Sequence, residues 1–381
     1  MKRLLFILPL LLLAACRQGA GNVELTDFDS LIVTPSYASG FRILGAPEHE
    51  STIIETFAPW QGADSNDVRR LLILRDGEAV PLGYRGPVLK GLPRNIVAMS
   101  TSHVAMLSML GRTNLISGVS GKKFVYDPLM QARADSVAEI GYEGNIDYET
   151  LLGASPDVVI LYGINGPSSL ETRLDELGIP YIYIGEYVEN HPLGKAEWIY
   201  ALAELTGDAA KARQVFGGVE RNYLALRDSA LTFSDRPDVM INTPYGGIWY
   251  VPSVDSYVVR LINDAGGTYM PERTGVAPEG NASGTVDTEQ AYAMMAQSDI
   301  WLHPGQASSL DQLADVCPQF TSTPPFRNGM VFNNNLRTTP DGGNDYFESG
   351  VVRPDLVLRD LITIFHPGED CGPTVYHHRL K

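Results

Sequence analysis

Two stretches of the chain carry a glutamate at the same place in a repeated pattern. In the first, Asp147 and Glu149 precede a short apolar segment and a buried strand, and in the second Asp287 and Glu289 do the same. Each Asp is expected to cap a helix, so each Glu lies in the first helical turn. A carboxylate there can accept paired hydrogen bonds from an arginine of another protein, or it can simply complement the helix dipole.

A unit that is used twice, far apart in the sequence, predicts two similar lobes that face each other across a cleft. Clefts between lobes are where ligands bind. The two glutamates would then occupy matching positions, one on each lobe.

Aromatic side chains in the loops after the predicted strands are candidate ligand contacts, because such loops line the cleft. Aromatic walls suit a large, partly apolar ligand such as a corrin, a porphyrin or a catecholate complex, and a Tyr or His can also ligate haem iron. An Arg in a later loop can pair with a ligand carboxylate or phosphate. Any one of these side chains could instead pack in the core or lie on the surface. The predicted ligand-binding residues are Tyr126, Tyr142, Tyr162, Tyr187, Trp249, Tyr250, His303 and Arg337, with Tyr245 beside them.

A bare metal ion is an alternative ligand. His103, Glu186 and His303 lie near predicted loops, but a zinc site needs three or four converging ligands. The sequence holds no tight His/Asp/Glu cluster, so we predict no resident metal and no cofactor.

A secreted hydrolase is the alternative of another class. The sequence has no Gly-x-Ser-x-Gly, no His-Glu-x-x-His and no phosphate-binding loop that ends in Lys-Ser/Thr. Paired carboxylates are abundant, which leaves a glycosidase open on residue types alone. The matched repeat favours a binding protein without catalysis.

The N-terminus predicts export and lipid anchoring. Lys2 and Arg3 precede an apolar run over residues 4–13, which is shorter than the roughly 20 residues of a membrane-spanning helix and is typical of a secretory signal. Cys16 follows Leu-Ala-Ala, a pattern that resembles a bacterial lipobox. We therefore predict a signal peptide over residues 1–15 and a lipidated Cys16; an ordinary signal peptide with an incidental Cys is the alternative.

Composition agrees with an exported, two-domain protein. The chain has 381 residues, 44% of them hydrophobic, and a formal net charge of −16, which argues against nucleic-acid binding. Residues 16–22 are expected to form a tether between the lipid and the body. Beyond Cys16 only Cys317 and Cys371 remain; in an oxidising compartment they could pair or stay as two free thiols.

The body divides into four predicted parts. Residues 23–91 are strand-like and form a β extension that packs on the first lobe, with a hairpin at Asp76-Gly77. Residues 92–193 and 236–381 alternate strands with helices, which predicts mostly parallel, Rossmann-like sheets. Between them, residues 194–235 are helical, and a long rigid helix over residues 209–231 joins the lobes. The loop over residues 334–349 is longer than most ordered loops, which suggests a function.

Several local patterns, in order, resemble a known family. Residues 96–111 resemble its first strand, Ser/Thr loop and helix; residues 116–119 its second strand; residues 147–159 its Asn-x-Glu and Lys-Pro-Asp-Leu-Val segment; and residues 177–180 its Leu-Gly-Ile turn. The family is that of the helical-backbone (class III) substrate-binding proteins of ABC importers, which carry ferric siderophores, haem and cobalamin. The resemblance covers residues 94–365, and the β extension and the tail over residues 368–381 depart from it.

The resemblance implies a function and partners. Glu149 and Glu289 match the family's acidic residues that dock onto arginines of a permease dimer in the inner membrane. The ligand would be haem, a ferric siderophore or cobalamin, held by a monomer whose linking helix allows only a small closure. The protein would be tethered to the bilayer through Cys16 in the cell envelope, and the absence of an acidic run over residues 17–20 favours an anchor that faces the periplasm. A surface-anchored scavenger that passes its ligand to another protein is a further alternative.

Overall fold

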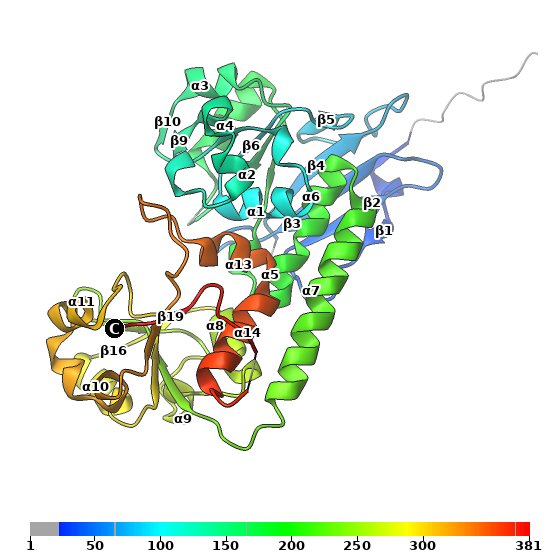
Figure 1. Cartoon of the computed structure of the whole chain (residues 1–381). Helices are drawn as coiled ribbons and strands as arrows, with labels where there is room; N and C mark the ends of the chain where they lie inside the picture. Colours follow the sequence, from blue (N-terminus) through cyan, green and yellow to red (C-terminus); the bar gives the residue numbers. More distant parts are fainter. Residues whose placement is uncertain (1–22, 65, 165, 370) are drawn as a thin grey trace, which may run out of the picture.

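The computed structural model describes residues 23–381 except 65, 165 and 370 (Figure 1). The predicted signal peptide, Cys16 and the tether lie outside the described residues. The described part contains two five-stranded α/β sheets, one per lobe, and a five-stranded sheet from the N-terminal extension. None of the helices in this part combines the length and the apolar character that a membrane span requires.

The N-terminal extension forms one sheet in chain order. After a short 3-10 turn, η1 (Leu25–Asp27), the strands are β1 (Ser30–Val33), β2 (Phe41–Gly45), β3 (Thr52–Phe57), β4 (Val68–Leu74) and β5 (Val88–Lys90). The predicted hairpin at Asp76-Gly77 is wrong, because β4 and β5 run parallel. Gly77 does turn the chain, with φ 84°. The Glu78 carboxylate then accepts hydrogen bonds from the backbone N–H groups of Glu50 and Ser51, which connects the turn to the segment before β3.

Two carboxylates, Glu189 at the end of the N-terminal lobe and Glu197 in α5 (Pro192–Glu197), hold the extension in place. Glu197 accepts hydrogen bonds from the backbone N–H groups of residues 36–38, at 2.7–2.8 Å. Glu189 accepts from those of Ser39 and Gly40, at 2.9–3.0 Å. The segment between β1 and β2 is thereby attached to the N-terminal lobe.

The N-terminal lobe is built on a fully parallel sheet of order β12-β11-β6-β7-β8. Ser100 caps the first helix through the backbone N–H of Ser102, as its sequence predicts. The strands are β6 (Ile96–Ala98), β7 (Ile116–Val119), β8 (Ala138–Glu139), β11 (Val158–Leu161) and β12 (Tyr181–Tyr183), with a small hairpin of β9 (Gly141–Tyr142) and β10 (Asn145–Ile146). The helices are α1 (Thr101–Met109), α2 (Pro128–Gln131), α3 (Tyr148–Gly153) and α4 (Ser169–Leu177), and short 3-10 turns lie at η2 (Thr113–Leu115), η3 (Lys122–Phe124) and η4 (Ala134–Ser136).

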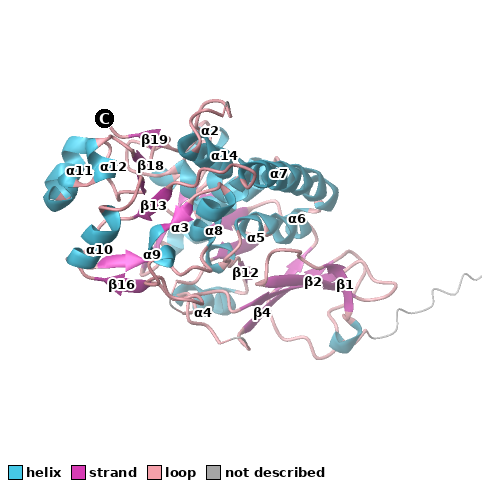
Figure 2. Ribbon diagram, turned by 90° about the horizontal axis from the view of Figure 1, so that it is seen from below, coloured by secondary structure: helices cyan, strands magenta, loops and turns pink. Residues whose placement is uncertain are grey.

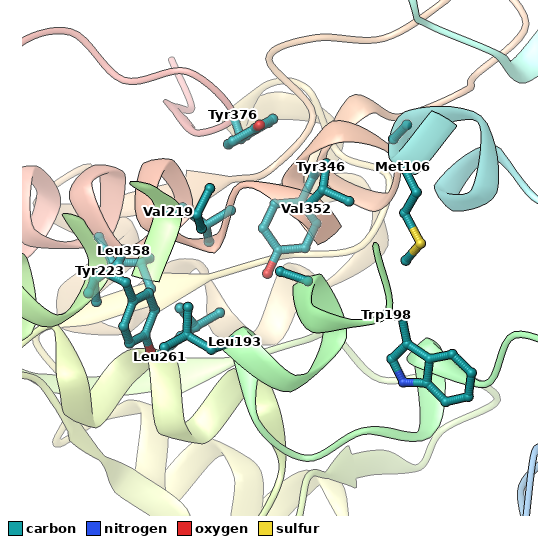
Figure 3. Close-up of a cluster of buried hydrophobic side chains, with 14 of the residues drawn as sticks. Met106, Leu193, Trp198, Val219, Tyr223, Leu261, Tyr346, Val352, Leu358 and Tyr376 are labelled. Carbon is teal, nitrogen blue, oxygen red and sulfur yellow. The ribbon is translucent and has the colours of Figure 1, made fainter. Parts of the chain in front are cut away.

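The predicted linking helix is confirmed. After η5 (Glu186–Val188), α5 (Pro192–Glu197) and α6 (Ile199–Thr206), α7 (Ala209–Ala230) runs for 22 residues, about 33 Å at 1.5 Å per residue. Figure 1 shows it running beside both lobes. Its buried stripe includes Phe216, Val219 and Tyr223, and Figure 3 shows the last two within the apolar cluster where the lobes meet.

The C-terminal lobe repeats the architecture with a sheet of order β15-β13-β17-β18-β19, parallel except for the edge strand β19. Figure 2 shows β18 and β19 at one end of this sheet. The strands are β13 (Asp238–Ile241), β15 (Thr268–Tyr269), β17 (Ile300–Leu302), β18 (Val331–Asn333) and β19 (His378–Arg379), and β14 (Trp249–Val251) pairs separately with β16 (Gly284–Val286). The helices are α8 (Tyr257–Asp264), α9 (Met270–Arg273), α10 (Thr288–Met295), α11 (Leu310–Val316), α12 (Pro324–Arg327), α13 (Ser349–Val352) and α14 (Pro354–Phe365), with 3-10 turns at η6 (Pro318–Ser322) and η7 (Asp345–Phe347).

The long loop over residues 334–349 connects the two lobes a second time. Thr339 Oγ1 donates to the backbone carbonyl of Lys123 in the N-terminal lobe, at 2.9 Å. The Glu348 carboxylate accepts from the backbone N–H groups of Tyr126 and Asp127, both at 2.7 Å. The loop is therefore part of the interface between the lobes.

The cysteines of the body are separate. Cys317 is buried and Cys371 is half-buried, and both are free thiols. Burial raises the pKa of Cys317 to about 11. Of the two alternatives left open by the sequence, the structure contains the free thiols.

Candidate functional site

A cavity of about 410 Å³ lies between the two lobes. Its N-terminal side comes from loops at the carboxyl ends of β6, β11 and β12, the edge where open parallel sheets bind ligands. Its C-terminal side comes from the start of α8, from η7 and α13, and from the first turn of α14. The lining residues are Ser100, Ser102, Tyr162, Ile164, Glu186, Tyr187, Pro192, Lys195, Tyr257, Leu261, Tyr346, Phe347, Gly350, Val351, Pro354 and Val357.

Five aromatic rings form much of the wall of this cavity. Tyr162 and Tyr187 come from the N-terminal lobe, and Tyr257, Tyr346 and Phe347 from the C-terminal lobe. Burial is the main cause of a raised pKa for each of the four tyrosine hydroxyls, which stay protonated at neutral pH. The wall is thus an uncharged aromatic surface with hydroxyl groups that donate and accept hydrogen bonds.

A buried carboxyl group lies at the N-terminal side of the cavity. Glu186 is 4% exposed, and one of its oxygens accepts a hydrogen bond from Ser102 Oγ. Its other oxygen, Oε2, has no hydrogen-bond partner among the described residues. Burial raises the pKa of Glu186. The carboxyl group can therefore meet a donor on a ligand at little extra desolvation cost.

Lys195 places a cation beside the same carboxyl group. Its Nζ donates to the backbone carbonyls of Glu186 and Tyr187, at 2.8 and 3.0 Å, and lies 4.6 Å from the centroid of the Tyr257 ring. Burial lowers the pKa of Lys195 to about 8, so the ammonium form still predominates at pH 7. This is the one lysine or arginine among the described residues that line the cavity.

Only two of the predicted ligand-binding residues, Tyr162 and Tyr187, line this cavity. Tyr126 and Arg337 instead pack against each other at the interface between the lobes, with the guanidinium carbon 4.9 Å from the ring centroid. Arg337 also forms an ion pair with Asp345, at 3.0 Å, which leaves it committed to the protein rather than directed into the cavity.

The other predicted contacts lie away from this cavity. Trp249 is 1% exposed and packs in the core against Trp301 and Phe320, while the next residue, Tyr250, is 44% exposed. The reason is that β14 pairs with β16 outside the main sheet, and successive side chains of a strand point to opposite faces. Trp249 and Tyr250 therefore face opposite sides of β14, and the prediction that both contact one ligand does not fit their positions.

Tyr142 and Tyr245 are surface residues. Tyr142 lies in the hairpin of β9 and β10 and is 42% exposed, and Tyr245 is 80% exposed at a turn that precedes β14. Neither lines the cavity between the lobes.

His303 is half-buried and pairs with the buried His377 within the C-terminal lobe. Its Nε2 lies 3.0 Å from Nε2 of His377, whose Nδ1 lies 3.2 Å from the Asp360 carboxylate. Burial, together with His377, lowers the pKa of His303 well below its ordinary value, so its ring is neutral. Its Nε2 is engaged within the lobe and His303 does not line the cavity, so the structure does not bring this predicted residue into the site.

The residues considered for a bare metal do not converge. His103 Nε2 lies 3.9 Å from Glu186 Oε2, but His303 is in the other lobe. Burial lowers the pKa of His103 to about 3. Within the described residues, no group of three or more His, Cys, Asp or Glu side chains is positioned to hold a metal ion.

Glu149 and Glu289 occupy equivalent places in the two lobes. They lie in the first turns of α3 and α10, whose N-termini are capped by Asp147 and Asp287 through the backbone N–H three residues on. Both glutamates are exposed. Three residues after each, on the same helical face, lies an exposed apolar or aromatic side chain: Leu152 is 47% and Tyr292 is 37% exposed.

Sequence reasoning missed three aromatic residues of the wall and Lys195, and it considered Glu186 only as a ligand of a bare metal ion. Tyr346 and Phe347 lie in the loop over residues 334–349, and the unusual length of that loop was the feature of the sequence that could have pointed to them. Tyr257 begins α8, and nothing in the local sequence marks Lys195 as a cavity residue.

Comparisons with known proteins agree with this architecture. Residues 96–334 match the family model described as periplasmic binding protein. An uncharacterized lipoprotein of Methanocaldococcus jannaschii is 24% identical over 283 residues, which cover 71% of this chain. The chain spans 65% of that relative's length. The family and this relative's name indicate a location in the cell envelope.

Solved structures show the same fold. A periplasmic haem-binding protein from Pseudomonas aeruginosa superposes with a TM-score of 0.58 at 16% identity, covering 76% of this chain and 99% of that one. The periplasmic vitamin B12 binding protein of Vibrio cholerae superposes with a TM-score of 0.52 at 13% identity, covering 72% and 96%. With a family match over more than half its length and two α/β lobes joined by a long helix, this chain belongs to the periplasmic binding protein family, in its helical-backbone class.

Proposed function

We propose that this protein is the substrate-binding lipoprotein of an ABC importer and that it holds an iron complex, either haem or a ferric siderophore, or a cobalamin between its lobes. The observation that carries the proposal is the cavity of about 410 Å³, to which both lobes contribute aromatic rings. Its size lies within the range of about 300–1,000 Å³ for small-molecule sites. The fold neighbours include proteins named for binding haem and vitamin B12.

The polar groups of the cavity narrow the chemistry of the ligand. Two N–H donors of Lys195 go to backbone carbonyls, and its third donor suits a carboxylate or another anionic oxygen of a ligand. Glu186 Oε2 suits a hydrogen-bond donor. Together with the aromatic wall, these groups support a large, partly apolar ligand that carries a few polar substituents.

Glu149 and Glu289 are the proposed docking points for the permease. Each is an exposed carboxylate at a helix start, where an arginine can bind it through two hydrogen bonds. Two such points on two lobes fix the orientation of the bound protein. The exposed Leu152 and Tyr292 beside them add apolar area to the same faces.

Titration of residues 22–381 without lipid tests the binding function. Haemin, cyanocobalamin, a ferric hydroxamate and a ferric catecholate are added separately, and tryptophan fluorescence and the visible spectrum are followed. We expect one class of these compounds to bind the unaltered protein. The variant Ile164→Trp fills the cavity from an exposed lining position and should bind that class at least about tenfold more weakly.

Leu129→Trp is the matched control, because Leu129 is 57% exposed and does not line the cavity. It should bind as the unaltered protein does. Binding of no probe, or equal binding by the two tryptophan variants, would overturn the proposal and turn attention to a smaller ligand, a bare metal ion or a hydrolase.

A further inference from the structure

A second cavity, of about 460 Å³, adjoins the first. Tyr187 and Tyr257 line both, so the two form adjacent compartments of one cleft. Its other lining residues come from the N-terminal extension and from both lobes. They are Ser39, Gly40, Phe57, Ala58, Trp60, Gln61, Gly62, Ala63, Val188, Glu189, Asn190, Ser256 and Asn281.

One wall of the second cavity is formed by residues 57–63, which are the last residue of β3 and the loop after it and are here called the extension loop. It lies outside the part of the chain that matches the family model, which begins at residue 96. The compartment is therefore made with a segment that lies outside the family match.

The N-terminal lobe is shaped to receive the extension loop. A Cβ atom at Gly163 would lie 2.7 Å from the Gly166 carbonyl oxygen of the same loop and 2.9 Å from the Trp60 ring. A Cβ atom at Gly185 would lie 3.2 Å from Cα of Pro59. Both glycines lie in loops that also carry aromatic residues of the first cavity. The missing side chains allow the extension loop to approach these loops closely.

Hydrogen bonds join the extension loop to the first cavity. The Gln61 backbone N–H lies 2.9 Å from Tyr187 Oη and 3.2 Å from the Ile164 carbonyl. Tyr187 Oη in turn donates to the Ile164 carbonyl, at 3.0 Å. The loop thus positions two residues that line the first cavity as well as forming a wall of the second.

The second cavity combines apolar side chains with neutral polar ones, and the hydrogen-bonding capacity of the one charged side chain among its described lining residues is already used. Glu189 is the one charged residue among its described lining residues, and its carboxylate already accepts from Ser39, Gly40 and the Trp198 indole. The neutral side chains of Asn190 and Asn281 meet across the two lobes, with Nδ2 donating to Oδ1 at 2.6 Å.

We infer that the second cavity, walled by the extension loop, binds an uncharged amide- or hydroxyl-bearing part of the same ligand whose apolar part occupies the first cavity. The inference rests on the proposed function, because it assigns a further part of that ligand's site. Side-chain amides and hydroxyls recognise neutral donors and acceptors, and the Trp60 and Phe57 rings provide apolar surface beside them.

An uncharged diamide, N-acetylglycine N-methylamide, is the probe for this compartment, and its binding is measured by saturation-transfer NMR. Gln61→Trp fills the cavity from the extension loop, and Asn281→Trp fills it from the C-terminal lobe. Both side chains are exposed at the surface. We expect the diamide to bind the unaltered protein and to bind each variant at least about tenfold more weakly.

Val80→Trp and Ala282→Trp are the controls, since both residues are exposed and neither lines the cavity. They should bind the diamide normally. Melting curves check that each variant folds; if Gln61→Trp does not, Asn281→Trp carries the test.

The outcomes separate this inference from the proposed function. No binding of the diamide to the unaltered protein, or equal binding by all folded variants, would overturn the inference even if haemin or cobalamin binds. Diamide binding that is lost in the two cavity variants would support it even if all iron and cobalt complexes fail.

Discussion

Gly343 is the position at which the packing between the lobes is most easily tested. A Cβ atom there would lie 2.1 Å from the carbonyl oxygen of Phe124 and 2.6 Å from its carbonyl carbon, whereas such contacts need at least about 3.0 Å. Because the obstructing atoms are backbone, no side chain can rotate away. Gly343→Ala must therefore move the loop over residues 334–349 away from the N-terminal lobe.

The expected cost follows from the contacts that this movement weakens. Overpacking against a fixed group costs about 1–3 kcal/mol, and each hydrogen bond lost between Glu348 and the backbone of Tyr126 and Asp127 costs about 0.5–1.5 kcal/mol. With both hydrogen bonds lost, Gly343→Ala should thus lower the free energy of unfolding by about 2–6 kcal/mol. It should also weaken ligand binding, because Tyr346 and Phe347 of the cavity follow in the same loop.

Urea denaturation and solution scattering measure the two effects, and Gly342→Ala is the control. Gly342 has φ 90° and no atom within 4 Å of an added Cβ, so its substitution costs only the strain of a left-handed residue, about 1–2 kcal/mol, and leaves the lobes in contact. Equal stability of the two variants, with identical scattering curves, would refute the interpretation of residues 334–349 as a second connection between the lobes.

Four other predictions can be tested, of which the one on Cys16 rests on the sequence alone. Glu149→Ala with Glu289→Ala should change stability by about 0.3–1 kcal/mol per site and leave ligand affinity intact while uptake in cells is abolished; normal uptake would contradict the docking role. Burial raises the pKa of Glu348 to about 8, so the folded state holds a proton at Glu348 that the unfolded state loses above the ordinary value of 4.5. The contribution of this proton to the free energy of unfolding is complete below pH 4.5 and is lost as the pH rises through 8. Urea denaturation between pH 5 and 9 should show this loss in the unaltered protein, and Glu348→Gln should show less of it. Cys16→Ser should release the protein from the membrane fraction, and an unchanged distribution would count against lipidation. Because α7 resists bending, the radius of gyration should change little when ligand is added, and a large compaction would refute a rigid linking helix.

Features that depend on neighbouring residues were predictable from the sequence. Asp147 and Asp287 cap their helices, as the short polar side chain before an apolar run indicates. The helix over residues 209–231 was recognisable from its apolar spacing, since a repeat of 3.6 residues places those side chains on one face. Tyr162 lines the cavity because it directly follows a buried parallel strand, and strand ends define that edge of the sheet.

Features that depend on residues far apart in the chain were not predictable in this way. Alternation along β14 indicates that one of Trp249 and Tyr250 is buried, but the pairing with β16 decides which one. Arg337 has the chemistry of an anion-binding residue, and only the folded chain brings Asp345 and Tyr126 beside it.

The sequence by itself determined the class of protein: two α/β lobes, a linking helix and a matched pair of exposed glutamates, all of which follow from local periodicity, capping and strand–helix order. The tertiary structure decided the composition of the binding cleft. Lys195, Tyr346 and the extension loop meet there only because segments from residues 39 to 357 are packed together. The physical reason is that burial, and with it the pKa of Lys195 and Glu186, depends on which distant segments exclude water from a side chain, and no short stretch of sequence contains that information.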